Sequence, residues 1–213
     1  MATYDLDEQE RLDELKAWWK RWGNLVMVGL AVVIAAAAGW RYWQNRVLTQ
    51  SLEAATVYEK LTQSMAANDA KAAREAGAML IDHYQGTPYA PRAALLLAKL
   101  NVEGKDLKSA QTQLEWALAN SKEPAVKDLA RLRLAAVQLD QKQYDAALKT
   151  LSATHSDAFA FRFEDLKGDV LLAQGKPAEA RAAYEAAFGK LEEGHPYRNI
   201  VELKIDALGG AAK

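Results

Sequence analysis

The hydrophobic positions divide this chain into one uniformly apolar run near the N-terminus and a series of helical patterns behind it. Between Arg21 and Arg41 lie 19 residues without a single charge. As a helix, they span roughly 28 Å at 1.5 Å per residue, close to the hydrocarbon thickness of a bilayer. Aromatic side chains stand at both ends, as a membrane–water interface favours: Trp18, Trp19 and Trp22, then Trp40, Tyr42 and Trp43. The pattern predicts a transmembrane helix over residues 22–43.

Two other interpretations of the apolar run are open on the sequence. A core helix of a soluble protein should display a polar face, and the middle of this run displays none. A cleaved signal peptide would fit Leu25–Ala38, where Ala36–Ala38 has the small residues of a cleavage site. However, residues 1–21 carry six acidic side chains against four basic ones, which is unlike a basic leader. We therefore expect an uncleaved anchor.

The N-terminal tail, residues 1–21, has a periodicity of its own. Apolar residues recur at three- and four-residue steps, which predicts either an amphipathic helix or a solvated tail: Leu12, Leu15, Trp19 and Trp22. Basic residues cluster beside the apolar run, at Lys16, Lys20 and Arg21. By the positive-inside rule, the tail is expected in the cytoplasm and residues 44–213 on the other side of the membrane.

Behind the anchor, helical patterns recur with a period near 34 residues. Three stretches, which begin at Leu95, Leu132 and Leu166, each have an apolar helix, a short turn and an Ala-rich helix. The central small residues of the second helices are Ala110, Ala147 and Ala180, and a less regular earlier copy would place Ala76 there. Helical hairpins of this length resemble tetratricopeptide repeats, in which small residues let neighbouring helices approach closely.

The sequence as a whole thus predicts an all-α protein. A single N-terminal transmembrane helix would be followed by a tetratricopeptide-like helical-repeat solenoid over residues 44–213. The last stretch, "HPYRNIVELKIDAL" from His195, would form a C-terminal capping helix that closes the stack. A generic helical bundle remains the alternative for residues 44–213.

Composition and charge exclude several classes of function. The formal net charge is −1, and 22 basic and 22 acidic residues follow Trp43, so no electrostatic groove for nucleic acid is expected. The chain has no cysteine, and its histidines, His83, His155 and His195, are too far apart in sequence to suggest a metal site. Phosphate-binding loops, nucleophile elbows and metalloprotease helices are absent from the sequence. We expect no enzyme and no cofactor or metal.

The candidate functional residues are those of a partner-binding surface. In tetratricopeptide stacks the first helix of each pair lines the concave face where partner segments bind. On this chain the rule selects Leu95, Lys99 and Val102, then Leu132, Ala136 and Leu139, then Asp165, Asp169 and Leu172. Several of these leucines could instead belong to the core. The Lys and Asn clamp that some such domains use for a peptide carboxylate is missing, so extended or helical apolar segments are the expected ligands.

A line of small residues marks one face of the predicted transmembrane helix. Ala31, Ala35 and Gly39 are four residues apart, a spacing that permits another transmembrane helix to approach closely. Alanine is also common in any helix, so the line could have no role in packing.

Taken together, these features resemble the YfgM family, ancillary subunits of the bacterial SecYEG translocon. The resemblance rests on the acidic-then-aromatic tail, on "GWRYW" at Gly39–Trp43 and on the repeat "LRLAAVQLDQKQYDAALKTL". It implies a single-pass type II protein of the bacterial inner membrane with a periplasmic tetratricopeptide-like domain. It also implies association with SecYEG and with the membrane-anchored periplasmic chaperone PpiD, in a non-enzymatic chaperone or adaptor role for newly exported proteins. A scaffold of another envelope complex is the alternative function.

Overall fold

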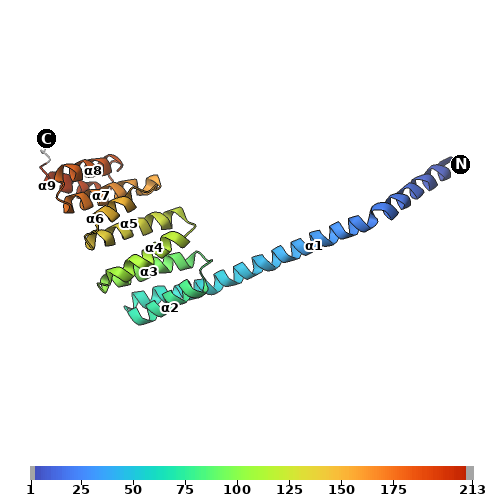
Figure 1. The fold of residues 1–213 in the computed structure, drawn as a ribbon, viewed down its shortest axis with the longest axis horizontal. Helices are drawn as coiled ribbons and strands as arrows, with labels where there is room; N and C mark the ends of the chain where they lie inside the picture. The colour runs from blue at the N-terminus through green and yellow to red at the C-terminus, as the bar shows by residue number, and fades with distance from the viewer. Residues whose placement is uncertain (1–2, 210–213) are drawn as a thin grey trace. The chain divides into compact units, whose positions relative to one another are not determined.

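The computed structural model describes residues 3–209, with side chains from Arg11 onwards. All regular structure in this part of the chain is helical, which confirms the all-α prediction (Figure 1). The elements are α1 (Thr3–Ala66), α2 (Ala70–His83), α3 (Tyr89–Glu103), α4 (Leu107–Asn120), α5 (Pro124–Asp140), α6 (Tyr144–Leu151), the 3-10 helix η1 (Asp157–Phe159), α7 (Ala160–Ala173), α8 (Pro177–Gly189) and α9 (Arg198–Ala207).

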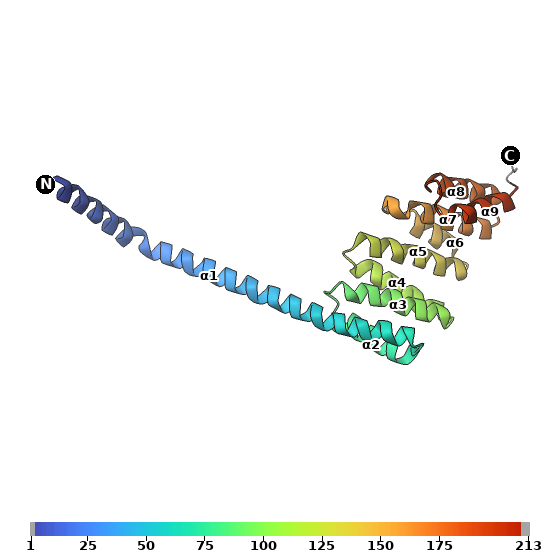
Figure 2. The same cartoon turned by 180° about the vertical axis from the view of Figure 1, so that it is seen from behind.

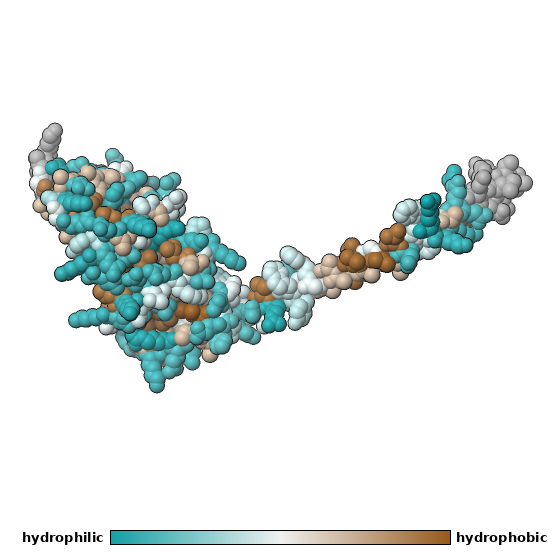
Figure 3. All heavy atoms as spheres, in the orientation of Figure 1, coloured by the Kyte–Doolittle hydropathy of each residue, from teal (hydrophilic) through white to brown (hydrophobic). Residues whose placement is uncertain are grey.

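The chain divides into two compact units within α1, between Gln50 and Ser51. The first unit consists of the longer part of α1, which is helical from Thr3, so the N-terminal tail and the apolar run form one continuous helix. The apolar run is seen as the hydrophobic stretch of α1 in Figure 3. Its side chains lie open, with Leu25 and Val33 each 64% exposed. Because a core helix would bury one face, that interpretation of the run is wrong.

The second unit begins with the last turns of α1 and is built from four helical hairpins. At each hairpin turn one residue adopts a left-handed backbone, at Asn68 (φ 56°), Lys105 (φ 62°), Lys142 (φ 62°) and Gly175 (φ 77°). These turns follow one another after 37, 37 and 33 residues. In each, the next residue's N–H reaches back to the helix that is ending, as Asp106 does to the carbonyl of Asn101 at 2.8 Å, which is a Schellman-type end. The repeated turn is direct structural support for the predicted repeats.

An alanine occupies the same place after every turn. The N–H groups of Ala73, Ala110, Ala147 and Ala180 each donate a 3.0 Å hydrogen bond to the carbonyl four residues earlier, and all four side chains are 0% exposed. The small residue therefore marks where the second helix of each hairpin packs most closely. In the first hairpin this residue is Ala73, so the sequence alignment on Ala76 was wrong by three residues.

The helices of the second unit pack on their neighbours in chain order, as both ribbon views show (Figures 1 and 2). Close approach is clearest between α7 and α8, where a Cβ on Gly168 would collide with the ring of the fully buried Tyr184. The connection from α6 to α7 is held by Asp128, which is 2% exposed. Its carboxylate accepts hydrogen bonds from the backbone N–H of Ser156 at 3.0 Å and from the Ser156 hydroxyl at 2.8 Å.

The C-terminal helix α9 closes the stack against α8, as the capping prediction required. Val201 is fully buried there, in one apolar cluster with Leu171, Tyr184 and Leu191. A guanidinium also stacks on an aromatic ring, since Arg198 lies 3.8 Å from the ring centre of Phe188.

Candidate partner-binding surface

An apolar opening on the first helices of the hairpins lies between α3 and α5. Each of the two hairpin connections that join α3 to α4 and α4 to α5 is three residues long, so α3 and α5 run in the same direction. Between them is a cavity of about 320 Å³. We call it the α3–α5 groove, and it is lined by Ala98, Lys99, Val102, Glu103, Leu114, Arg133, Ala136, Val137 and Asp140. Its floor is apolar and its walls carry four charges.

Three of the nine predicted binding residues line this groove. Lys99, Val102 and Ala136 lie at successive turns of α3 and α5, and Val102 is 37% exposed. Leu95 and Leu132 instead have 4% and 8% of their surface exposed and pack in the apolar core. These two therefore fit the core alternative that the sequence left open.

The remaining predicted residues lie nearer the C-terminal end. Leu139 is half-buried against the core cluster around Leu132, whereas Leu172 is 43% exposed. Asp165 and Asp169 on α7 meet α9, whose Lys204 Nζ is 2.8 Å from Asp165 Oδ1 and 2.8 Å from Asp169 Oδ1. The structure thus assigns the two carboxylates an intramolecular partner that periodicity alone does not reveal.

Two tyrosines complete the contacts of these carboxylates. The hydroxyl of Tyr197 donates to Asp165 Oδ2 at 2.9 Å, and that of Tyr184 donates to Asp169 Oδ1 at 2.8 Å. Burial, reinforced by these hydrogen bonds, raises the pKa of both phenols above the ordinary value of 10.0. Burial alone would lower the pKa of Lys204, but hydrogen bonds to both carboxylates outweigh it and raise that pKa above 10.5.

Sequence reasoning missed Arg133, the most distinctive charge in the α3–α5 groove. Its Nη1 donates to the backbone carbonyl of Leu95 at 3.1 Å, which holds the side chain across the gap between α5 and α3. Burial lowers the pKa of the guanidinium. The signal in the sequence was the spacing of Arg133, Ala136 and Asp140, which puts all three on one face of α5.

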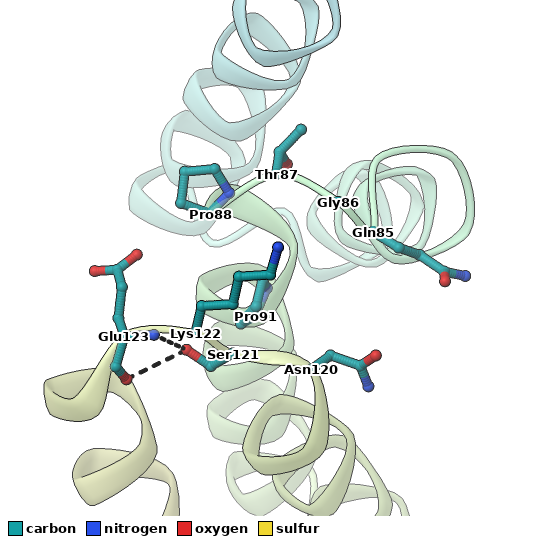
Figure 4. A pocket seen from close by; sticks show the side chains of 9 residues that line it. All are labelled: Gln85, Gly86, Thr87, Pro88, Pro91, Asn120, Ser121, Lys122 and Glu123. Atoms are coloured by element: carbon teal, nitrogen blue, oxygen red, sulfur yellow. Dashed lines mark hydrogen bonds between the residues drawn. The ribbon is translucent and has the colours of Figure 1, made fainter. Parts of the chain in front are cut away.

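A second, smaller cavity lies where the α2–α3 and α4–α5 connections meet, and its volume is about 140 Å³ (Figure 4). Its polar groups serve the loops themselves. The Ser121 hydroxyl is 3.1 Å from the backbone nitrogen of Glu123, whose carboxylate pairs with Arg92 at 2.7 Å. Thr87 donates to the carbonyl of Tyr84 at 2.8 Å. These bonds hold the two connections in their observed geometry.

Among the described residues, histidine and carboxylate side chains do not assemble into a metal site. Within the described part of the chain, no group of three or more His, Asp or Glu side chains could hold an ion. The ring of His155 stacks on Phe163 with 4.2 Å between centres, and that of His195 meets Phe161 edge-on at 5.3 Å. Both histidines therefore have packing roles.

The line of small residues in α1 has open space around it. Among the described atoms nothing lies within 4 Å of a Cβ built on Gly39, and Ala31 and Ala35 are exposed on the same face. By length and composition, α1 is the one helix among residues 11–209 that could cross a membrane.

Comparison with known proteins agrees with this architecture over nearly the whole chain. The family described as "Tetratricopeptide repeat-like domain" matches residues 16–210. A Neisseria gonorrhoeae protein named ancillary SecYEG translocon subunit is 34% identical over 98% of this chain and 100% of its own length. Proteins of the same name from Haemophilus influenzae and Escherichia coli are 32% and 29% identical, covering 87% and 98% of this chain and 90% and 99% of their own lengths. The resemblance carried by "GWRYW" and the repeats is confirmed, and the chain belongs to the family of tetratricopeptide repeat-like ancillary SecYEG translocon subunits.

Proposed function

We propose that this protein is a non-enzymatic adaptor of the SecYEG translocon, anchored in the bacterial inner membrane, that holds segments of newly exported proteins. The observation that carries the proposal is the α3–α5 groove, which has a volume of about 320 Å³ and an apolar floor. It lies on the repeat domain of a chain whose α1 could cross a membrane. A groove of this size accommodates a few side chains of a polypeptide. The names of the relatives, which describe subunits of the translocon, support SecYEG as the assembly it joins.

In this proposal residues 1–21 are cytoplasmic, residues 22–43 cross the membrane and residues 44–213 are periplasmic. The basic cluster beside the apolar run supports the orientation through the positive-inside rule. A PpiD-type chaperone is the second proposed partner, on the family resemblance. Fusion of alkaline phosphatase after Lys213 tests the orientation, because this enzyme folds to an active form in the periplasm. Activity of a cytoplasmic reporter at the same position, with an inactive phosphatase, would reverse it.

Groove binding is tested by photo-crosslinking in cells that are exporting a labelled protein. A photoreactive amino acid replaces Val102 in the groove, and a matched variant carries it at Ala119, an exposed residue of α4 outside the groove. The proposal expects crosslinks to the exported chain from position 102 and few from position 119. Equal yields from both positions, at equal abundance, would contradict a role for the groove.

Co-purification from mild detergent separates the proposal from its alternative, a scaffold for another envelope complex. The adaptor proposal expects SecYEG and the PpiD-type chaperone to be recovered with the full-length chain. A scaffold would instead recover a different set of envelope proteins and leave SecYEG behind. Because this assay reports assembly, it is independent of which surface binds exported segments.

A further inference from the structure

The α3–α5 groove contains two charged side chains that have no oppositely charged partner among the described residues. Lys99 and Glu103 pair with each other along α3, with Nζ and Oε1 3.7 Å apart. Among the described side chains, neither Arg133 nor Asp140 has an oppositely charged group within the 4.0 Å of an ion pair. Arg133 has five N–H donors, and one of them forms a hydrogen bond with the carbonyl of Leu95. The groove is therefore electrically neutral in total, but positive at one place and negative at another.

The separation of these charges is set by the helix that carries both. Arg133 and Asp140 are seven residues apart on α5, which places them about 10 Å apart along the axis on the same face. Ala136 and Val137 lie between them, and Ala98 and Val102 lie opposite on α3. The order along the groove is thus a cation, an apolar floor and an anion.

An extended polypeptide matches this order over three residues. At about 3.3 Å per residue, two side chains three positions apart are separated by about 10 Å. In a polyproline II conformation, with three residues per turn, they also point to the same side. A carboxylate can accept hydrogen bonds from two N–H groups of a guanidinium in a bidentate pair. Arg133 should therefore contribute more than Asp140 to the selectivity among segments.

We propose that the α3–α5 groove selects extended segments in which an acidic and a basic residue flank two apolar residues. The acidic side chain pairs with Arg133, the basic side chain pairs with Asp140, and the stretch between them, with its two apolar residues, lies across the apolar part of the groove. Either chain direction satisfies this order, because the charges and not the backbone are read. The inference rests on the proposed function in one respect, since it names the class of segment that the same groove binds.

The contrast with α7 supports this reading of the free charges. On α7 the inward carboxylates Asp165 and Asp169 are neutralised by Lys204 of the chain itself. None of the described residues neutralises Arg133 in this way. Burial lowers the pKa of its guanidinium, and a negative partner would compensate for that loss of hydration. The guanidinium of Arg133, beside an apolar floor, is therefore suited to form an ion pair with an anionic group of a bound polypeptide.

The test uses the full-length protein in nanodiscs of phosphatidylcholine, a lipid without net charge. Three fluorescent peptides share the same central leucine pair and differ in the two flanking residues: one acidic and one basic, both acidic, or both basic. Binding is followed by fluorescence anisotropy. For the wild type we expect the mixed peptide to bind about tenfold more tightly than either like-charged peptide, which corresponds to about 1.4 kcal/mol.

Charge reversal should then reorder the three peptides. Arg133→Glu is expected to favour the dibasic peptide and Asp140→Lys the diacidic one. Lys149→Glu on α6 and Glu202→Lys on α9 change the net charge equally at exposed positions outside the groove, and should keep the wild-type order. Because Arg133→Glu removes the bond to Leu95, Arg133→Gln serves as a second variant, and it should abolish the preference for the mixed over the dibasic peptide.

Equal binding of the three peptides to the wild type would overturn the charge selection while leaving groove binding in place. An unchanged order in a folded Arg133→Gln or Asp140→Lys protein would do the same. Failure of all three peptides to bind would also overturn it. The proposed function is judged separately, by crosslinks from position 102 to exported chains, so the two failures are distinguishable.

Discussion

Replacement of Lys204 by methionine should loosen the C-terminal cap. Methionine keeps most of the apolar stem and removes the ammonium group, whose Nζ lies 2.8 Å from both Asp165 and Asp169. The side chain of Asp165 is 7% exposed, so among the described residues its carboxylate would keep only the Tyr197 hydroxyl as a hydrogen-bond partner. Breaking a fully buried pair costs about 3–5 kcal/mol. Since Lys204 is 27% and Asp169 34% exposed, we expect solvent to reduce the loss to about 2 kcal/mol.

The loss should be local, because each element of a repeat stack contacts only its neighbours. Native-state hydrogen exchange is the suitable assay, since it resolves α9 from α3. Amide protection in α9 is expected to fall by a factor of about 30, which corresponds to about 2 kcal/mol, with little change in α3. Lys149→Met, at an exposed position of α6, is the matched control. Unchanged protection of α9, or an equal loss throughout the stack, would refute the reasoning.

The same contacts predict a stability limit at alkaline pH. The pKa of Lys204 is higher in the folded protein than its ordinary 10.5, so its contribution is complete below pH 10.5 and is lost as pH rises through the folded pKa. Tyr184 and Tyr197, with pKa values raised above 10.0, act in the same direction. Protection of α9 should therefore decline above about pH 10, and more steeply in the wild type than in Lys204→Met.

Further variants test the packing of the repeats and of the anchor. Gly168→Ala should lower the free energy of unfolding by about 1–3 kcal/mol, because the new methyl group meets the ring of Tyr184, and a denaturant titration measures this. Asp128→Asn should cost about 1–3 kcal/mol by weakening the two bonds to Ser156, with hydrogen exchange increasing first at the α6–α7 connection. Ala35→Leu should weaken association with SecYEG or the PpiD-type chaperone by about 1 kcal/mol, so that less of either is recovered by co-purification, without affecting membrane insertion. Recovery equal to that with the wild type would indicate that the span is a simple anchor.

Much of the fold follows from local sequence signals. The helix starts at α2 and α4 are set by Asp69 and Asp106, whose carboxylates accept the backbone N–H three residues on at 3.0 Å. The buried alanines after the last three turns, Ala110, Ala147 and Ala180, were predicted from periodicity alone. The register of the first hairpin was not, because its first helix is the end of α1 and has no start signal of its own. Only the left-handed turn at Asn68 identifies Ala73 as the equivalent residue.

The binding surface was predictable in part. Periodicity selected α3 and α5, and three of the residues that it selected, Lys99, Val102 and Ala136, line the candidate groove between them. It could not separate these from Leu95 and Leu132, because Leu95 and Lys99, like Leu132 and Ala136, are four residues apart and lie on the same face of a helix. Whether a charged side chain forms an ion pair within the fold is harder still to predict, because this depends on which side chain of another helix lies beside it.

That dependence explains why similar positions on α5 and α7 have different roles. The inner carboxylates of α7 lie next to the end of the stack, where α9 supplies Lys204, and their charge is used to hold the cap. The inner face of α5 adjoins another hairpin's first helix, α3, whose own charges pair with each other. Among the described residues, Arg133 and Asp140 are consequently left without an ion-pair partner at the groove. The last hairpin thus serves stability, and the proposed recognition of polypeptide segments is confined to α3 and α5.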